Sequence, residues 1–181
     1  MDGSREQSTQ ARTGRHRPRL RPPLSRLEVA LIVLSVAGVV ANIAPVAVWW
    51  AALPGTVPTH FAASGRPDAV GGKGQLLAAP IFAVVVTALF MLLARVPHLL
   101  NYPVAITLGN AERQYRRGRV VLRVVNAGLV WALAVWTWFV MQAALGHAVG
   151  LPSWFTPVAI ALALLVPVGA LTLIVVWAVR G

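Results

Sequence analysis

The chain has 181 residues, a formal net charge of +11 at pH 7, 57% hydrophobic residues and no cysteine. With only 12% charged residues, this composition lies outside the range of soluble globular domains and indicates a membrane protein. The lack of cysteine excludes disulfides, thiolate metal sites and a cysteine nucleophile within this chain. We expect no nucleic-acid partner, because the arginines flank apolar runs and no recognition module is present.

Uncharged apolar runs follow one another at residues 29–50, 74–94, 124–146 and 153–179. About 20 helical residues cover the hydrocarbon core of a bilayer, so each run is long enough to span it. We therefore predict an all-α membrane protein with four transmembrane helices. In chain order, its parts are an Arg-rich tail (1–26), helix 27–50, a loop (51–75), helix 76–97, a basic connection (98–122), helix 123–146, a short loop (147–153) and helix 154–179.

Arginine is concentrated in the tail and around the basic connection, whereas the loop 51–75 carries only Arg66 and Lys73 as cations. An excess of lysine and arginine marks the cytoplasmic segments of membrane proteins. We therefore predict a multi-pass protein of the cell membrane with both termini in the cytoplasm. The loops 51–75 and 147–153 are then extracytoplasmic.

The tail 1–26 holds few apolar residues, so we expect it to be disordered. At its end, Ser25 is placed to be the N-cap of the first helix, with Glu28 at the N3 position of a capping box. The apolar run that follows is longer than the core of a signal peptide, so we expect it to stay as a helix.

The loop 51–75 places several prolines, a histidine, an aspartate and a lysine in a short stretch. Proline fixes φ and removes a backbone donor, so this loop is predicted to be stiff. Loops held by a rigid scaffold are common places for binding function. The candidate binding residues are Pro54, Pro58, His60, Phe61, Gly65, Pro67, Asp68 and Lys73.

The histidine and the aspartate of this loop leave more than one chemistry open. Together with His147 they would supply three metal ligands. Tetrahedral sites use three or four protein ligands, and only these three candidates are evident in the sequence, so we expect no metal and no cofactor. As an acid–base pair, His60 and Asp68 have no nucleophile or second carboxylate beside them outside the membrane, so we expect no enzymatic activity.

Two further interpretations of the loop remain. In a structural one, Asp68 pairs with Lys73 or Arg66 and His60 caps a turn. In a functional one, Phe61 is the apolar anchor for a ligand or peptide, and His60, Asp68 and Lys73 supply the polar contacts.

Inside the predicted spans, polar residues are few. We expect Asn42 and Asn126 to form hydrogen bonds between helices, and Gly38, Gly128 and Gly169 to allow close helix approach. No ionisable side chain lies near the centre of a span, which counts against a pump or proton-coupled transporter.

The basic connection is predicted to contain a helix that begins after Asn110 as N-cap and continues into the third span. Glu112 and Arg116 have the i,i+4 spacing of a supporting ion pair. The simplest role of the arginines is to anchor the helix at the membrane surface. The alternative is a docking surface for an acidic cytoplasmic partner, formed by Asn110, Arg113, Gln114, Tyr115, Arg116 and Arg117.

Two groups of residues carry a resemblance to a known family. They are Leu53-Pro54, Pro58, His60-Phe61, Gly65, Pro67-Asp68 and Lys73 after the first helix, and then Asn101-Tyr102-Pro103, Ile106-Thr107, Asn110-Ala111 and Gln114-Tyr115. This pattern resembles the SdpI-like family, small bacterial membrane proteins named for an immunity protein against a secreted sporulation-delaying toxin. The resemblance implies toxin resistance coupled to capture of a cytoplasmic repressor. The chain departs from the family in its Arg-rich tail and in being shorter than the longer members.

The leading hypothesis is therefore SdpI-like sensing of, or immunity to, an extracellular peptide or envelope stress through the His60/Asp68 loop. The alternative is a non-catalytic membrane scaffold or assembly subunit that recruits anionic lipid or a cytoplasmic partner through its basic segments. A small-solute channel is a third class, and because the spans offer little polar lining it would require a homo-oligomer. The partners expected are the lipid bilayer, a secreted peptide outside and a cytoplasmic regulator inside.

Overall fold

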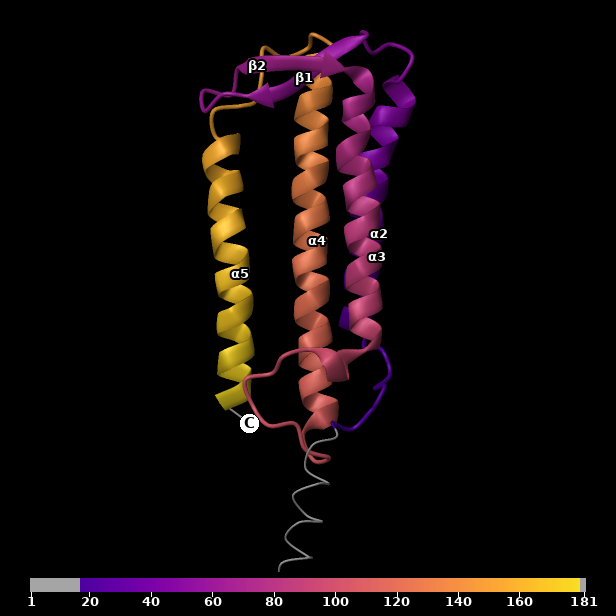
Figure 1. Ribbon diagram of the computed structural model, residues 1–181, viewed down its shortest axis with the longest axis vertical. Helices are drawn as coiled ribbons and strands as arrows, with labels where there is room; N and C mark the ends of the chain where they lie inside the picture. Colours follow the sequence, from indigo (N-terminus) through magenta and orange to yellow (C-terminus); the bar gives the residue numbers. More distant parts are fainter. Residues whose placement is uncertain (1–16, 180–181) are drawn as a thin grey trace, which may run out of the picture.

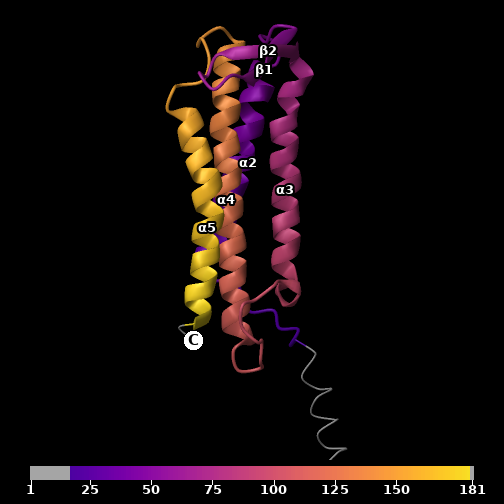
Figure 2. The same cartoon turned by 60° about the vertical axis from the view of Figure 1, so that its left-hand side comes forward.

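The computed structural model describes residues 17–179, in which long helices run side by side and a small β-hairpin covers one end (Figure 1). A second view places the hairpin at the same end (Figure 2). In chain order the elements are α2 (Arg26–Trp49), β1 (Thr56–Phe61), β2 (Pro67–Gly72), the 3₁₀ helix η1 (Lys73–Leu77), α3 (Ala78–Arg95), the 3₁₀ helix η2 (Pro97–Leu99), α4 (Ala111–Ala144) and α5 (Phe155–Val179).

Within residues 17–179, four helices are long and apolar enough to cross a membrane, one in each predicted run. The chain is therefore a predominantly helical, multi-pass membrane protein. The beginning of α2 and the end of α5 lie at the same end of the bundle, opposite the hairpin (Figure 1). We call this the basic end, because the connection between α3 and α4 and its arginines lie there.

The first helix begins as its sequence predicts. The Ser25 hydroxyl accepts a hydrogen bond from the Glu28 backbone N–H, and the Glu28 carboxylate accepts one from the Ser25 N–H at 2.8 Å. This capping box satisfies two backbone donors that a helix start leaves unpaired. It also fixes the position of the Glu28 carboxylate, which is fully buried.

Asn42 forms a buried polar link between α2 and α4. Its Nδ2 donates to the Val130 backbone oxygen at 2.9 Å, and its Oδ1 accepts from the Thr137 hydroxyl at 3.0 Å. Thr87 of α3 donates to Asn126 of α4 at 3.3 Å. Both asparagines therefore join helices, as predicted, and the α4 helix is the one that α2 and α3 share.

Of the three glycines expected to allow close helix approach, only Gly38 lies at a contact between helices. A Cβ on Gly38 would approach the Val130 side chain to 2.6 Å, so glycine allows α2 and α4 to pack closely there. Gly128 and Gly169 face open space instead, and for them the prediction is wrong.

The loop after α2 is not an irregular coil, so the all-α prediction needs a correction. β1 and β2 form a two-stranded antiparallel sheet. Prolines and glycines are uncommon in β-strands, so the sequence of this loop did not predict strands. These residues are tolerated because every strand in a two-stranded sheet is an edge strand, where a missing N–H need not break a ladder.

The tail also differs from its prediction where the structure describes it. The segment 17–25 lies against α4: Tyr115 donates its hydroxyl to the Pro18 oxygen at 2.9 Å, and Arg119 donates to the Pro22 oxygen at 2.8 Å. These side chains supply polar contacts that the composition of the tail alone does not reveal. The rest of the predicted disordered tail, residues 1–16, lies outside the described residues.

Candidate functional site

The hairpin brings His60 and Asp68 together. The ladder is irregular around Thr59, so that Pro58 pairs with Val70 while His60 pairs with Ala69. This irregularity places the His60 Nδ1 2.5 Å from the Asp68 Oδ1. Their side chains are 70% and 46% exposed, so the pair stands on the outer surface of the hairpin. The structural interpretation in which Asp68 pairs with Lys73 or Arg66 is wrong.

The opposite face of β1 packs on the bundle. Val57 is fully buried beside Val46 of α2 and Met141 of α4. Phe61 lies edge-on to the Trp136 ring of α4, with the ring centres 5.6 Å apart. Because neighbouring residues of a strand point to opposite faces, Phe61 faces inward where His60 faces outward. One short strand thus links a polar surface to the apolar bundle.

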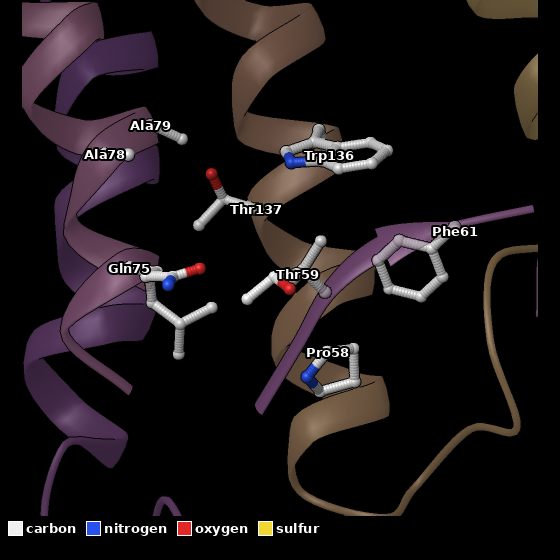
Figure 3. A pocket seen from close by; sticks show the side chains of 10 residues that line it. Pro58, Thr59, Phe61, Gln75, Ala78, Ala79, Trp136 and Thr137 are labelled. Atoms are coloured by element: carbon white, nitrogen blue, oxygen red, sulfur yellow. The ribbon is translucent and has the colours of Figure 1, made fainter. Parts of the chain in front are cut away.

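A cavity of about 370 Å³ lies beneath β1. Its walls come from β1, from η1 and the start of α3, and from α4. Gln75, Thr59 and Thr137 are its polar groups, and Phe61 and Trp136 lie at one side (Figure 3). The volume falls in the range of small-ligand sites, which are mostly apolar with a few placed polar groups. The cavity is suited to hold an apolar side chain.

The other predicted loop residues shape this arrangement. Pro58 lines the cavity, and Pro67 pairs with Phe61 at the turn end of the sheet, whereas Pro54 is exposed. Lys73 does not contact Asp68. Its Nζ lies 3.4 Å from the Trp50 backbone oxygen and 5.0 Å from the centre of the Trp50 ring, so it holds the start of η1 on the end of α2.

Gly65 joins the hairpin to the loop between α4 and α5. It has φ +79°, a conformation that residues with a Cβ rarely adopt. A Cβ here would meet the Leu151 oxygen at 2.5 Å, and one on Gly150 would meet the Gly65 oxygen at 2.2 Å. Both glycines are therefore required by a close backbone contact between the two loops.

The metal alternative has no ligand set in the described part of the chain. Among residues 17–179, no three histidine, cysteine, aspartate or glutamate side chains come together in a way that would hold a metal ion. His147 instead lies 3.2 Å from the Gln142 side-chain oxygen.

The docking set at the basic end is only partly at the surface. Gln114 and Tyr115 are buried, at 5% and 0% exposure, and Tyr115 packs on the Tyr102 ring with their centres 5.7 Å apart. Burial raises the pKa of the Tyr102 phenol, so that it remains a neutral donor to the Pro97 oxygen at 2.9 Å. Gln114 and Tyr115 therefore hold the bundle together rather than face a partner.

The remaining members of that set lie nearer the surface. Arg113 is exposed, and Arg116 forms its predicted ion pair with Glu112 at 3.0 Å. Arg117 is half-buried. Asn110 precedes α4 as predicted, but its side chain makes no cap: it accepts from the Thr107 N–H and donates to the Ala105 oxygen, which closes the preceding turn.

Sequence reasoning did not find the residues that η1 and α4 bring to the cavity, chiefly Gln75, Trp136 and Thr137. The cavity depends on how β1 lies across the helix ends, and no local pattern encodes that. The sequence signal was a tryptophan and a threonine side by side within the predicted span 123–146.

Comparisons with known proteins cover part of the chain. Residues 37–84 match the family model described as "Domain of unknown function (DUF1648)", which covers the second half of α2, the hairpin and the beginning of α3. An uncharacterized protein of Archaeoglobus fulgidus is 35% identical over 105 residues, which is 53% of this chain and 57% of that protein. The chain thus spans little more than half the length of this relative. No solved structure matches. The chain is therefore similar, over residues 37–84, to a domain family of unknown function, and to a relative that is itself uncharacterized.

Proposed function

We propose that this protein is an SdpI-like membrane protein that recognises an extracytoplasmic peptide through its hairpin and so senses or resists it. The observation that carries the proposal is that β1 presents the His60–Asp68 pair outward and Phe61 inward, over a cavity of about 370 Å³. A peptide would place a polar or charged group on the pair and an apolar side chain in the cavity.

The geometry supports a peptide because the hairpin has strand edges to offer. Within the described residues the sheet has two strands, so the outer edge of β2 has no strand beside it. An extended peptide can add to such an edge through backbone hydrogen bonds, while pockets for its side chains give specificity. Val70 of β2 is 71% exposed and would be an apolar contact at this edge.

The proposed role is binding without catalysis. The His60 and Asp68 side chains stand in solvent, whereas catalytic groups act most strongly in preorganised sites from which water is excluded. The extracytoplasmic side is proposed for the hairpin because the described arginines, Arg66 excepted, lie at the opposite, basic end.

The scaffold alternative draws less support. A cytoplasmic partner would have to dock on the candidate docking residues between Asn110 and Arg117. Two of them, Gln114 and Tyr115, are buried. Arg113 alone is fully at the surface among its arginines, and single exposed charges contribute little to binding.

The test uses a strain of the source organism that lacks the gene, challenged with the peptide fraction of that organism's own spent medium. The wild-type protein is expected to restore survival, and His60→Ala/Asp68→Ala is expected to lose that protection at equal membrane abundance. The matched control is Thr56→Ala/Arg66→Ala, which removes two exposed side chains of the same hairpin. Full protection by the His60/Asp68 double variant would contradict the proposed role.

A further inference from the structure

A second cavity lies at the basic end of the bundle, where the proposed function does not use it. It has a volume of about 430 Å³ and lies between the segment before α2, the beginning of α2, the end of α3 and α4. Four arginines contribute to its lining, and we call it the arginine pocket: Arg21, Arg95, Arg119 and Arg123.

The two inner arginines share a single carboxylate. Arg119 and Arg123 have side chains only 6% and 12% exposed, and both pair with Glu28, the Arg119 Nε at 2.9 Å from Oε1. Two buried cations and one buried anion leave one positive charge in excess. Burying a charge without an opposite one costs several kcal/mol, so the pocket favours the arrival of an anion.

No other carboxylate of the described residues balances that excess. Glu112 is engaged with Arg116 at 3.0 Å on the outside of α4. Asp68 lies in the hairpin, at the opposite end of the bundle (Figure 1). The anion that completes the arginine pocket therefore has to come from outside the described chain.

The two outer arginines stand at the entrance. Arg21 precedes α2 and Arg95 lies in the last turn of α3, and both are exposed. They line the same cavity as the inner pair, so an entering anion meets four guanidinium groups against one carboxylate. Guanidinium groups match phosphate oxygens in charge and in bidentate geometry.

The rest of the wall is apolar and continues into the membrane-spanning part of the bundle. Leu24 lies near the entrance, and Ile32, Phe90 and Met91 line the pocket further along α2 and α3. Ile32 is six residues beyond the first residue of α2, which is roughly 9 Å along the helix. A small inorganic anion would leave this wall uncovered, whereas a lipid would cover it with an acyl chain.

We propose that the arginine pocket binds an anionic phospholipid, with its phosphate among the arginines and an acyl chain against Ile32, Phe90 and Met91. The bound lipid supplies the missing negative charge and covers the apolar wall of the pocket. The cytoplasmic leaflet is the source that the positive-inside rule gives for this end.

The test is a lipid titration of the full-length chain in detergent, followed by native mass spectrometry. Phosphatidylglycerol is the probe, and phosphatidylcholine and inorganic phosphate are the comparison ligands. The variant Arg21→Gln/Arg95→Gln removes the entrance charges and leaves the buried Glu28 pairs intact. Its control is Arg19→Gln/Arg113→Gln, which removes the same charge from exposed positions at the same end but outside the pocket.

We expect the pocket variant to bind phosphatidylglycerol about thirtyfold more weakly than wild type, and the control to differ by less than about threefold. Equal losses in both variants would mean diffuse attraction to the basic end and would overturn the proposal. Equal binding of phosphatidylcholine would do the same. If inorganic phosphate displaced the lipid at equal concentration, the pocket would be a site for a free anion and not for a phospholipid.

Discussion

The backbone oxygen of Gly65, in the turn of the hairpin, accepts a hydrogen bond from the Leu151 N–H at 2.8 Å. This bond joins the loop after α2 to the loop after α4, two segments far apart in the sequence. The hairpin is therefore held at its turn by one loop and along β1 by α4. The His60–Asp68 pair and the cavity below it depend on both supports.

Replacing Gly65 by alanine is expected to loosen the hairpin. The new Cβ would occupy a positive-φ position and lie 2.5 Å from the Leu151 oxygen, so we expect a loss of about 1–3 kcal/mol in local stability. Limited proteolysis in detergent measures this as faster cleavage within residues 55–72. Gly55→Ala is the control, because a Cβ there has open space. Equal cleavage rates for the two variants would contradict the contact.

Asn42→Leu is expected to weaken the contact between α2 and α4. It removes the donor to the Val130 oxygen and the acceptor for Thr137 while keeping a side chain of similar size. Polar contacts between membrane helices contribute about 0.6–1.7 kcal/mol each, so we expect roughly 1–3 kcal/mol of lost unfolding free energy.

Reversible unfolding in mixed detergent micelles checks the Asn42 value. Thr172→Val is the control, because the Thr172 hydroxyl donates only to Val168 of its own helix. A loss for Asn42→Leu no greater than that of the control would show that the interhelical bonds add nothing.

Glu28→Gln is expected to destabilise the basic end strongly. It keeps the capping geometry with Ser25 but leaves Arg119 and Arg123 buried without an anion among the described residues. Breaking a buried ion pair on one side costs about 3–5 kcal/mol.

A thermal unfolding series on the full chain measures the Glu28 effect. The control is Glu112→Gln, which removes an exposed i,i+4 pair and is expected to cost under about 0.5 kcal/mol. Similar shifts in unfolding temperature for both variants would show that the buried ion pairs of Glu28 stabilise the protein no more than the exposed pair of Glu112.

Filling the cavity under β1 is expected to abolish protection without lowering membrane abundance. Ala79 lines the cavity, so Ala79→Phe would occupy space proposed for a peptide side chain. Survival of the deletion strain in the spent-medium assay measures the effect. Ala88→Phe, on an exposed part of the same helix, is the control. Protection by Ala79→Phe equal to that of the control would rule the cavity out as the binding site.

Local patterns were sufficient for the helices. Apolar runs located the four spans, and the Ser25–Glu28 spacing predicted a capping box that the structure contains. Asn42 and Asn126 were predicted to join helices because few other polar groups lie in the spans. These features depend on residues close together in the sequence, or on the strong cost of burying an amide in an apolar bundle.

Long-range contacts were beyond those patterns. The hairpin was missed because its prolines and glycines hide the strand signal. The candidate binding residues within it nevertheless include His60 and Asp68, whose side chains are in contact. The Glu28–Arg119–Arg123 cluster was missed because each arginine alone fits a membrane anchor. Their pairing follows only from packing α2 against α4, which brings together residues about 90 positions apart.

The orientation of the hairpin is the claim on which the proposed recognition rests, and cysteine labelling in intact cells tests it most directly. The chain has no native cysteine, so Ser64→Cys, Val149→Cys and Leu108→Cys each create one exposed thiol, the first two at the hairpin end and the third at the basic end. A membrane-impermeant thiol reagent is predicted to label positions 64 and 149 but to label position 108 only after the cells are lysed. Labelling of position 108 in intact cells, with 64 and 149 protected, would place the hairpin in the cytoplasm and contradict extracytoplasmic recognition.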